Sequence, residues 1–290
     1  MAVMEAWHPD RLTELSDLWN EAAPAEPLVE DELEACWRPG STVIGDEDGV
    51  VVTHAAGTTV SLDLVAVRPG ARRRGVGTRL VSAAIEAVGG DGVQWGASVP
   101  WYLWPGIEST RTEALALAES MGFEHRLPAI QNMTVDTHWQ VGRTPATGLI
   151  VRRAAPETAA PMLDLVVTEY AAWVDELTRA VDHGTAHTVF GDTVSDDSSS
   201  GVGVPLGVGA HSVNRLGWIG PMATFAAGRG RGVGSEALGA VCADLASAGY
   251  ATGEIAWVGP IRFYAKVSGA TTGRTYLPLT KRLRPPASGL

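Results

Sequence analysis

The sequence predicts an α/β protein made of two tandem modules, each a mixed, mostly antiparallel sheet flanked by helices. The main observation is a motif, Arg-x-x-Gly-x-Gly, found at Arg72–Gly77 and again at Arg229–Gly234, with Gly232 lying 157 residues after Gly75. Each copy follows an apolar, β-rich stretch and runs into a helix-forming stretch. A repeat of this length indicates a duplicated domain, because solenoid repeats are far shorter.

Residue patterns place the elements of the first module in order. Amphipathic spacing predicts helices over residues 10–22 and 29–37. After the motif helix and one strand come a rigid aromatic loop, Trp101–Trp104, and a helix that stops at Gly122, a residue type favoured just beyond a helix. The predicted strands cover residues 41–44, 50–55, 60–67, 93–99, 124–127 and 130–135.

The second half repeats this order. Helices are predicted over residues 157–168 and 170–181, along the second motif helix, and over residues 261–267, which Gly269 follows. Residues 195–201 have the composition of a polar, flexible hairpin loop. The predicted strands cover residues 185–194, 206–213, 216–225, 254–258 and 274–280.

A short stretch rich in Pro, Gly and Thr, residues 142–148, predicts the boundary between the modules. We therefore expect an N-terminal module over residues 1–140, a linker over 141–150 and a C-terminal module over 151–290. A chain of 290 residues is long enough for two domains of ordinary size.

Composition argues against several classes of protein. The net charge of −11 disfavours a nucleic-acid partner, which would require a basic surface. No signal peptide and no run of 18 apolar residues is found, so we expect a cytoplasmic protein without a membrane partner. Cys36 and Cys242 lie in apolar helical patterns and are expected to be buried free thiols. No Cys/His cluster predicts a metal site.

Each motif copy has the features of a pyrophosphate cradle. A strand ends, a glycine-rich turn follows, and a helix begins whose first amides have no intrahelical acceptor and whose dipole is positive there. Glycine allows a phosphate to approach the backbone closely. Neighbouring arginines add attraction and forked donors. A single copy is a weak signal, but two copies at one offset, each between a strand and a helix, form a strong one.

The first copy, read with its flanks from Val65 to Leu80, resembles the acetyl-CoA signature of the GNAT superfamily of N-acetyltransferases: a strand, a proline, then Gln/Arg-x-x-Gly-x-Gly/Ala opening a helix. The second copy is similar but lacks the proline. The resemblance implies acetyl-CoA as co-substrate, the amine of a small molecule or peptide as acceptor, and a monomer or homodimer. The implied acetyl-CoA-binding residues are Val65, Ala66, Val67, Arg72, Arg73, Arg74, Gly75, Val76, Gly77, Thr78, Met222, Ala223, Thr224, Arg229, Gly230, Arg231, Gly232, Val233, Gly234, Ser235 and Phe263.

The resemblance also implies a general acid, a tyrosine in the helix after the strand that splays from its neighbour. Tyr264 is the candidate, although it lies five residues before Gly269 where the family spacing is four. Its reference pKa of about 10 means that the phenol carries a proton at neutral pH. The first half has Leu117 and Ala118 at this place. It is therefore expected either to bind acetyl-CoA without an acid of its own or to be a structural copy.

Several residues could serve as the base. Glu254, which opens the strand before the helix of Tyr264, is the first candidate, and His211 and Asp63 are weaker ones; a water chain is a further alternative. Each residue also has a structural interpretation, since a buried tyrosine with a satisfied hydroxyl or a solvated strand-end carboxylate is common. The aromatic loop could shape an acceptor pocket or pack between modules, and packing is favoured.

Two other functions compete with catalysis of this kind. A non-catalytic protein could bind or sense acyl-CoA. Residues 232–237 also match the dinucleotide fingerprint G-x-G-x-x-A, with Glu254 twenty residues after Gly234, which suggests NAD(P). Against this, too little chain follows Glu254 to complete a doubly wound sheet. The tandem arrangement is also distantly similar to the mycothiol synthases of actinobacteria, but the second half lacks their usual Asn and Tyr-x-x-x-Gly-Phe ending.

Overall fold

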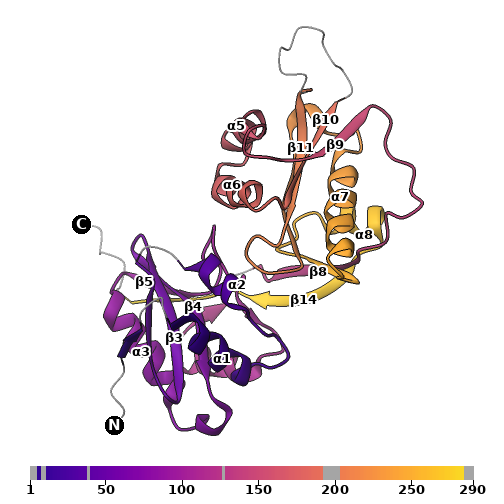
Figure 1. Ribbon diagram of the computed structural model, residues 1–290. Helices are drawn as coiled ribbons and strands as arrows, with labels where there is room; N and C mark the ends of the chain where they lie inside the picture. Colours follow the sequence, from indigo (N-terminus) through magenta and orange to yellow (C-terminus); the bar gives the residue numbers. More distant parts are fainter. Residues whose placement is uncertain (1–4, 8–10, 38–39, 126–127, 192–202, 284–290) are drawn as a thin grey trace. The chain divides into compact units, whose positions relative to one another are not determined.

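The computed structural model describes the chain except for residues 1–4, 8–10, 38–39, 126–127, 192–202 and 284–290. It divides into two compact units, the first made of residues 1–130 with 274–290 and the second of residues 131–273 (Figure 1). The predicted loop over residues 195–201 and the end of the chain lie outside the described residues.

The first unit contains one mixed sheet with helices packed on it. Its strands run in the order β1-β2-β3-β4-β5-β15-β7. Neighbours are antiparallel except for β4 and β5, and α1 and α3 both pack on β4. The elements are β1 (Glu5–Trp7), α1 (Leu12–Ala22), α2 (Glu30–Cys36), β2 (Thr42–Asp46), β3 (Gly49–Ala56), β4 (Thr59–Val67), α3 (Val76–Val88), β5 (Gly92–Trp95), β6 (Ile107–Glu108), α4 (Thr112–Ser120), β7 (Glu124–His125) and β15 (Leu279–Arg282).

The second unit repeats this plan. Its sheet has the order β6-β14-β8-β13-β12-β11-β10-β9, with β12 and β13 parallel and the short β6 pairing with the end of β14. Figure 1 shows α5 and α6 on one side of the sheet and α7 on the other. The elements are β8 (Ile130–Asp136), β9 (Leu149–Arg153), α5 (Ala160–Glu169), α6 (Val174–Asp182), β10 (Ala186–Gly191), β11 (Pro205–His211), β12 (Trp218–Thr224), α7 (Val233–Ser247), β13 (Thr252–Ile255), α8 (Ile261–Ser268) and β14 (Thr271–Leu277).

The α/β class with two mixed, mostly antiparallel sheets is confirmed, and so is the order of the helices. The strands β1, β6 and β9 were not predicted because they are short or lie in a stretch with linker composition. Apolar faces explain the helices: α3 buries Val76, Leu80, Val81 and Ala84, and α7 buries Leu238, Val241, Cys242 and Leu245. Cys36 and Cys242 are buried free thiols, as expected.

The chain exchanges strands between its two halves, and the compact units therefore differ from the predicted modules. The strand predicted over residues 274–280 is two strands, β14 and β15, with Pro278 between them. Because proline lacks a backbone N–H, it interrupts the ladder there. β15 pairs with β5 of the first unit, whereas β8, from the first half of the sequence, pairs with β13 of the second. The predicted linker over 141–150 also overlaps the start of β9.

The two motif turns have matching backbones. Gly75 and Gly232 stand immediately before α3 and α7, with φ of 79° and 84°. Two residues earlier, Arg73 and Gly230 also have positive φ, 62° and 75°. The left-handed region is unstrained only for glycine. The first copy therefore holds an arginine where its turn favours glycine.

We expect Arg73→Gly to stabilise the protein by about 0.5–1 kcal/mol, because relief of the left-handed strain outweighs the added entropy of an unfolded glycine. Urea unfolding of the full chain measures this change. Arg74→Gly is the matched control, since Arg74 is equally exposed but has no positive φ, and it should lose stability. A lower unfolding midpoint for Arg73→Gly than for the wild type would contradict the expectation.

Candidate active site

In each unit the strand before the motif separates from its parallel neighbour. β4 pairs with β5 only from Thr59 to Leu62. β12 pairs with β13 only at Trp218 and Ile219. Among the described residues, the rest of each strand edge has no ladder partner on that side, so it can accept an extended, amide-bearing chain as an added strand. The predicted residues 65–67 and 222–224 lie on these open edges.

The open edge of β4 leads to the start of α3. The first intrahelical hydrogen bond runs from the amide of Arg79 to the carbonyl of Gly75, 3.1 Å. The amides of Val76, Gly77 and Thr78 therefore have no intrahelical acceptor, and the helix dipole favours an anion beside them. A Cβ on Gly77 would lie 2.7 Å from Leu117, so this glycine also permits α4 to pack closely on α3.

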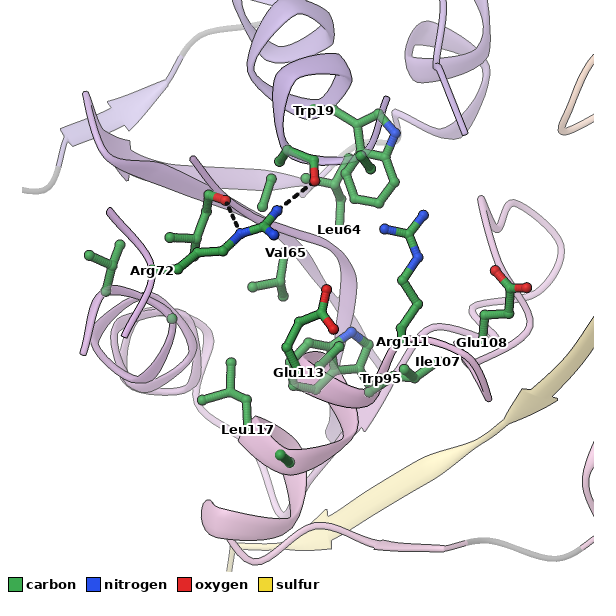
Figure 2. A pocket seen from close by; sticks show the side chains of 18 of the residues that line it. Trp19, Leu64, Val65, Arg72, Trp95, Ile107, Glu108, Arg111, Glu113 and Leu117 are labelled. Atoms are coloured by element: carbon green, nitrogen blue, oxygen red, sulfur yellow. Dashed lines mark hydrogen bonds between the residues drawn. The ribbon is translucent and has the colours of Figure 1, made fainter. Parts of the chain in front are cut away.

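The three motif arginines of the first copy have different surroundings. Arg72 donates from Nε to the Val67 carbonyl (3.2 Å) and from its guanidinium to the Ala22 carbonyl (2.6 Å), which ties β4 to the end of α1 (Figure 2). Arg74 points toward Asp48, at 3.8 Å. Arg73 is exposed and lines the same cavity as the open strand edge. Arg73 is therefore the arginine best placed for a phosphate.

A cavity of about 820 Å³ joins these features in the first unit. Nine of the residues predicted to bind acetyl-CoA line it; among the first-copy predictions only Arg74 does not. The nine are Val65, Ala66, Val67, Arg72, Arg73, Gly75, Val76, Gly77 and Thr78. Such a volume is typical of a small-molecule or cofactor site.

A row of buried, hydrogen-bonded polar side chains surrounds Asp63, which lines the cavity. The register of β3 and β4 shifts at Asp63, a β-bulge, one residue after the last pair with β5. The Asp63 carboxylate is 7% exposed and lines the cavity. His54 Nδ1 lies 2.6 Å from Oδ2, and the Ser61 hydroxyl donates to Oδ1 at 3.0 Å. Ser98 Oγ lies 2.9 Å from His54 Nε2, so the histidine is held on both sides.

Aromatic and charged side chains form the other end of the cavity. The rings of Trp19 and Trp104 contact each other at a tilt of 32°, with centroids 4.5 Å apart. Glu26 is buried and accepts hydrogen bonds from Trp104 Nε1 (2.6 Å), from Arg111 (2.7 Å) and from Arg274. Trp104, from the predicted aromatic loop, lines the cavity. Nothing in the local pattern of residues 26 or 111 marked them as site residues, because they meet only in the fold.

The second motif copy has a neighbour that the first lacks. A Cβ on Gly232 would lie 3.2 Å from the Cβ of Ala146. The Ala146 amide and both ends of the Arg143 guanidinium bind the Glu236 carboxylate at 2.7–2.8 Å, near the start of α7. Arg229 lies 3.4 Å from Glu169. The stretch before β9 therefore lies against this turn.

Tyr264 lies in the apolar core of the second unit, with Ile255 among its neighbours. Burial raises the pKa of its hydroxyl to about 12, so the phenol keeps its proton. Phe263 lies against Gly234 in the second unit, and Leu117 lies against Gly77 at the same place in the first. The residue that follows Leu117, Ala118, therefore occupies the position of Tyr264.

Glu254, the first candidate base, accepts a hydrogen bond of 2.6 Å from the buried amide of Asn132. Side chains alternate along a strand, so Glu254 and the neighbouring Ile255, which packs with Tyr264, point to opposite faces of the sheet. His211 points to Asp244 of α7, 3.3 Å away, and burial lowers its pKa. No group of three His, Cys, Asp or Glu side chains in the described part of the chain is arranged to hold a metal.

Comparisons with known proteins agree with this geometry. Residues 36–125 match the family model described as "Acetyltransferase (GNAT) domain". No curated protein matches the sequence. A tandem GNAT protein from the clavulanic acid biosynthesis pathway has a similar structure, with a TM-score of 0.74 and 16% identity over 99% of this chain and 100% of its own.

Two further solved structures are similar. A GCN5-related N-acetyltransferase from Sphaerobacter thermophilus gives a TM-score of 0.66, with 18% identity over 98% of this chain and 96% of its own. The glucosamine N-acetyltransferase region of a fungal multi-domain GH3 β-N-acetylglucosaminidase gives 0.73, with 17% identity over 97% of this chain. The chain spans only 38% of the length of that protein.

The splayed strands, the glycine turns and the two similar sheets define a protein of the GNAT fold, present twice in one chain. Residues 36–125 are similar to the GNAT acetyltransferase domain, and the chain as a whole has the fold of a tandem GNAT protein. Its two mixed sheets are not doubly wound parallel sheets, so the NAD(P) interpretation of Gly232–Gly234 loses its structural basis. None of the described helices is both long and apolar enough to cross a membrane.

Proposed function

We propose that the protein is an acetyl-CoA-dependent N-acetyltransferase, acting on the amine of a small molecule or peptide, and that its donor site is the cavity of the first unit. The observation that carries this proposal is the continuity of that cavity. It joins the open edge of β4, the first turn of α3 and the Asp63 carboxylate. In this assignment the α3 amides and Arg73 hold the pyrophosphate, and residues 64–67 hold the pantetheine arm by backbone hydrogen bonds.

Asp63 is the base in this proposal, in preference to Glu254. Acetyl-CoA supplies an acetyl thioester, and the acceptor arrives as an ammonium ion. Asp63 takes one proton from the ammonium, and the freed amine attacks the carbonyl carbon. A C–N bond forms, the C–S bond breaks, and the second amine proton neutralises the leaving thiolate. His54 and Ser61 are positioning residues that fix the two carboxylate oxygens.

The proposal gives the second unit a different role from the first. Tyr264 is the general acid and Glu254 the base only if its cradle, residues 222–224 and 229–235 with Phe263, also takes acetyl-CoA. The contacts of Ala146 and Glu236 at the start of α7 favour instead a second unit that supports the first without turnover. A non-catalytic acyl-CoA-binding role is then the alternative for this unit.

Calorimetric titration with acetyl-CoA tests the proposal on Gly75→Glu and Gly232→Glu. We expect the site of the first unit to be lost with Gly75→Glu, because an acidic side chain enters the phosphate cradle. Gly75→Ala and Gly232→Ala are the matched controls, since they share the positive-φ strain without the charge.

The outcomes separate the two units. Loss of binding with Gly75→Glu alone supports the assignment to the first unit, and two sites lost independently would make both units binders. Loss with Gly232→Glu alone would move the chemistry to Tyr264. No binding by the wild-type chain would overturn the acetyltransferase proposal.

A further inference from the structure

A segment with neither helix nor strand, residues 139–146, belongs to the connection from β8 to β9 and lies along α7 (Figure 1). We call this segment the strap. Trp139 packs on the apolar cluster to which α7 contributes. A Cβ on Gly239 would lie 3.7 Å from the Cβ of Gln140 and 3.4 Å from the guanidinium of Arg143. The strap is therefore in van der Waals contact with the middle of α7.

An ion pair anchors the strap near the start of α7. Both terminal nitrogens of Arg143 donate to the Glu236 carboxylate, at 2.8 and 2.7 Å, and the Ala146 amide donates to it at 2.8 Å. The Glu236 side chain is only 8% exposed, so water screens this pair little. The Arg143 guanidinium also lies over the Trp139 ring, 5.5 Å from its centroid. Three hydrogen bonds to one carboxylate thus hold the strap.

The anchored end of the strap covers the turn of the second motif copy. A Cβ on Gly232, the residue immediately before α7, would lie 3.2 Å from the Cβ of Ala146. A Cβ on the corresponding Gly75 would meet no other heavy atom of the described residues within 4 Å, and Gly75 lines the cavity of the first unit. A pyrophosphate at a helix N-terminus needs the space beside this glycine. The first cradle is therefore open on this side, and the second is covered.

The two motif copies also differ at the residue that anchors the strap. At the repeat offset of 157 residues, Glu236 corresponds to Arg79. Arg79 is exposed and lies 3.9 Å from Asp46 of β2. A carboxylate can bind the guanidinium of Arg143, whereas a second guanidinium would repel it. The anchor is therefore particular to the second copy.

We propose that the strap is an inhibitory contact that keeps acetyl-CoA out of the second cradle, and that its release uncovers a second acetyl-CoA site. The backbone of that site is already formed. Gly232 has nearly the φ of Gly75, and the edge of β12 beyond Ile219 has no ladder partner among the described residues on the β13 side. Gly230 stands where the first copy has Arg73, so the uncovered site should bind more weakly than the first. This inference rests on the proposed function, because it takes the motif turn as an acetyl-CoA cradle.

The test is calorimetric titration of acetyl-CoA into the full chain carrying Gly75→Glu, which removes the first site and leaves only the second to be measured. With the strap anchored, we expect no binding. Arg143→Ala together with Glu236→Gln removes the ion pair and leaves no unpaired charge, so acetyl-CoA should then bind at one site. Loss of a charge-assisted pair should raise the open fraction, and with it the apparent affinity, by about 10- to 100-fold.

Two further variants make the test specific. Glu236→Gln alone keeps the shape of the anchor and should restore part of the binding, which also covers the case in which the double variant does not fold. Arg152→Ala, a change of an exposed arginine on β9, is the matched control and should restore none. Gly232→Glu, added to the double variant, should abolish the restored binding.

Each outcome supports or overturns the inference. Equal binding by the Gly75→Glu chain with and without the anchor would overturn it, because the strap would then cover nothing. Folded released variants that bind no acetyl-CoA would overturn it too, and so would restored binding that survives Gly232→Glu. The proposed function fails on a separate result, which is a wild-type chain that binds no acetyl-CoA.

Discussion

Replacing Asp63 by Asn should lower kcat for acetyl transfer about 10²- to 10⁴-fold while acetyl-CoA binding is kept. The amide has nearly the same shape as the carboxylate but cannot take a proton from the acceptor. The pyrophosphate cradle at α3 shares no residue with this position, so the dissociation constant of acetyl-CoA should change little. Thiol release measured over a range of pH, together with calorimetry, separates the two effects.

Two other variants make this experiment specific. Ser61→Ala removes one hydrogen bond to Asp63 but keeps the carboxylate, so it should lower kcat less than Asp63→Asn does. Tyr264→Phe, in the second unit, should leave turnover nearly unchanged. The reverse pattern, with Tyr264→Phe inactive and Asp63→Asn active, would place the chemistry in the second unit and contradict the proposed base.

Replacing Glu176 by Gln should stabilise the protein at neutral pH by on the order of 3 kcal/mol. Burial raises the pKa of Glu176 to about 8 from an ordinary 4.5. Between these values the unfolded chain has lost the proton that the folded chain keeps. The unfolded state therefore binds fewer protons, and this group makes stability fall as pH rises from about 4.5 to about 8. Gln cannot titrate and keeps an oxygen for the Asn214 amide, which donates to Glu176 at 2.9 Å.

Unfolding free energies between pH 5 and 8 measure this effect. The wild type should lose stability over this range, and Glu176→Gln should have a flatter profile, with the two profiles meeting near pH 4.5. Asp175→Asn, at the exposed neighbouring position, is the control and should change the profile only slightly. Parallel profiles for the wild type and Glu176→Gln would show that Glu176 does not titrate in this way.

The strand, turn and helix that form the proposed donor site were predictable from the sequence because they are local. A strand, a turn and a helix N-terminus lie within the 20 residues from Thr59 to Thr78, and turn chemistry requires glycine at Gly75. The duplication reinforced the signal, since the same order of residues recurs before Gly232. A turn that requires glycine can be recognised in a single sequence, because the glycine itself is visible there.

The aromatic and charged part of the cavity could not be predicted because its members come from distant parts of the chain. Glu26, Trp104 and Arg274 meet only after folding, and each has an ordinary local sequence. The proposed role of Asp63 depends on a bulge between two strands, and neither strand alone encodes a register shift. Tyr264 was chosen from a helix pattern, and its position in an apolar core is a property of packing. The pairing of β15 with β5 and β7 could not be predicted either, because a sequence pattern identifies a strand but not the strands with which it pairs.

The position of β15 between β5 and β7 affects the order in which the protein can be made. Roughly 150 residues separate Ile130 from Leu279, and at about 5–20 residues per second a ribosome needs roughly 7–30 s to translate them. Until then β5 remains an open edge in the nascent chain, and such edges pair readily with other chains. The second unit, by contrast, is complete once Gly273 has been added. The half that is synthesised later can therefore reach its native state first, and the earlier half must be protected until the last strand arrives.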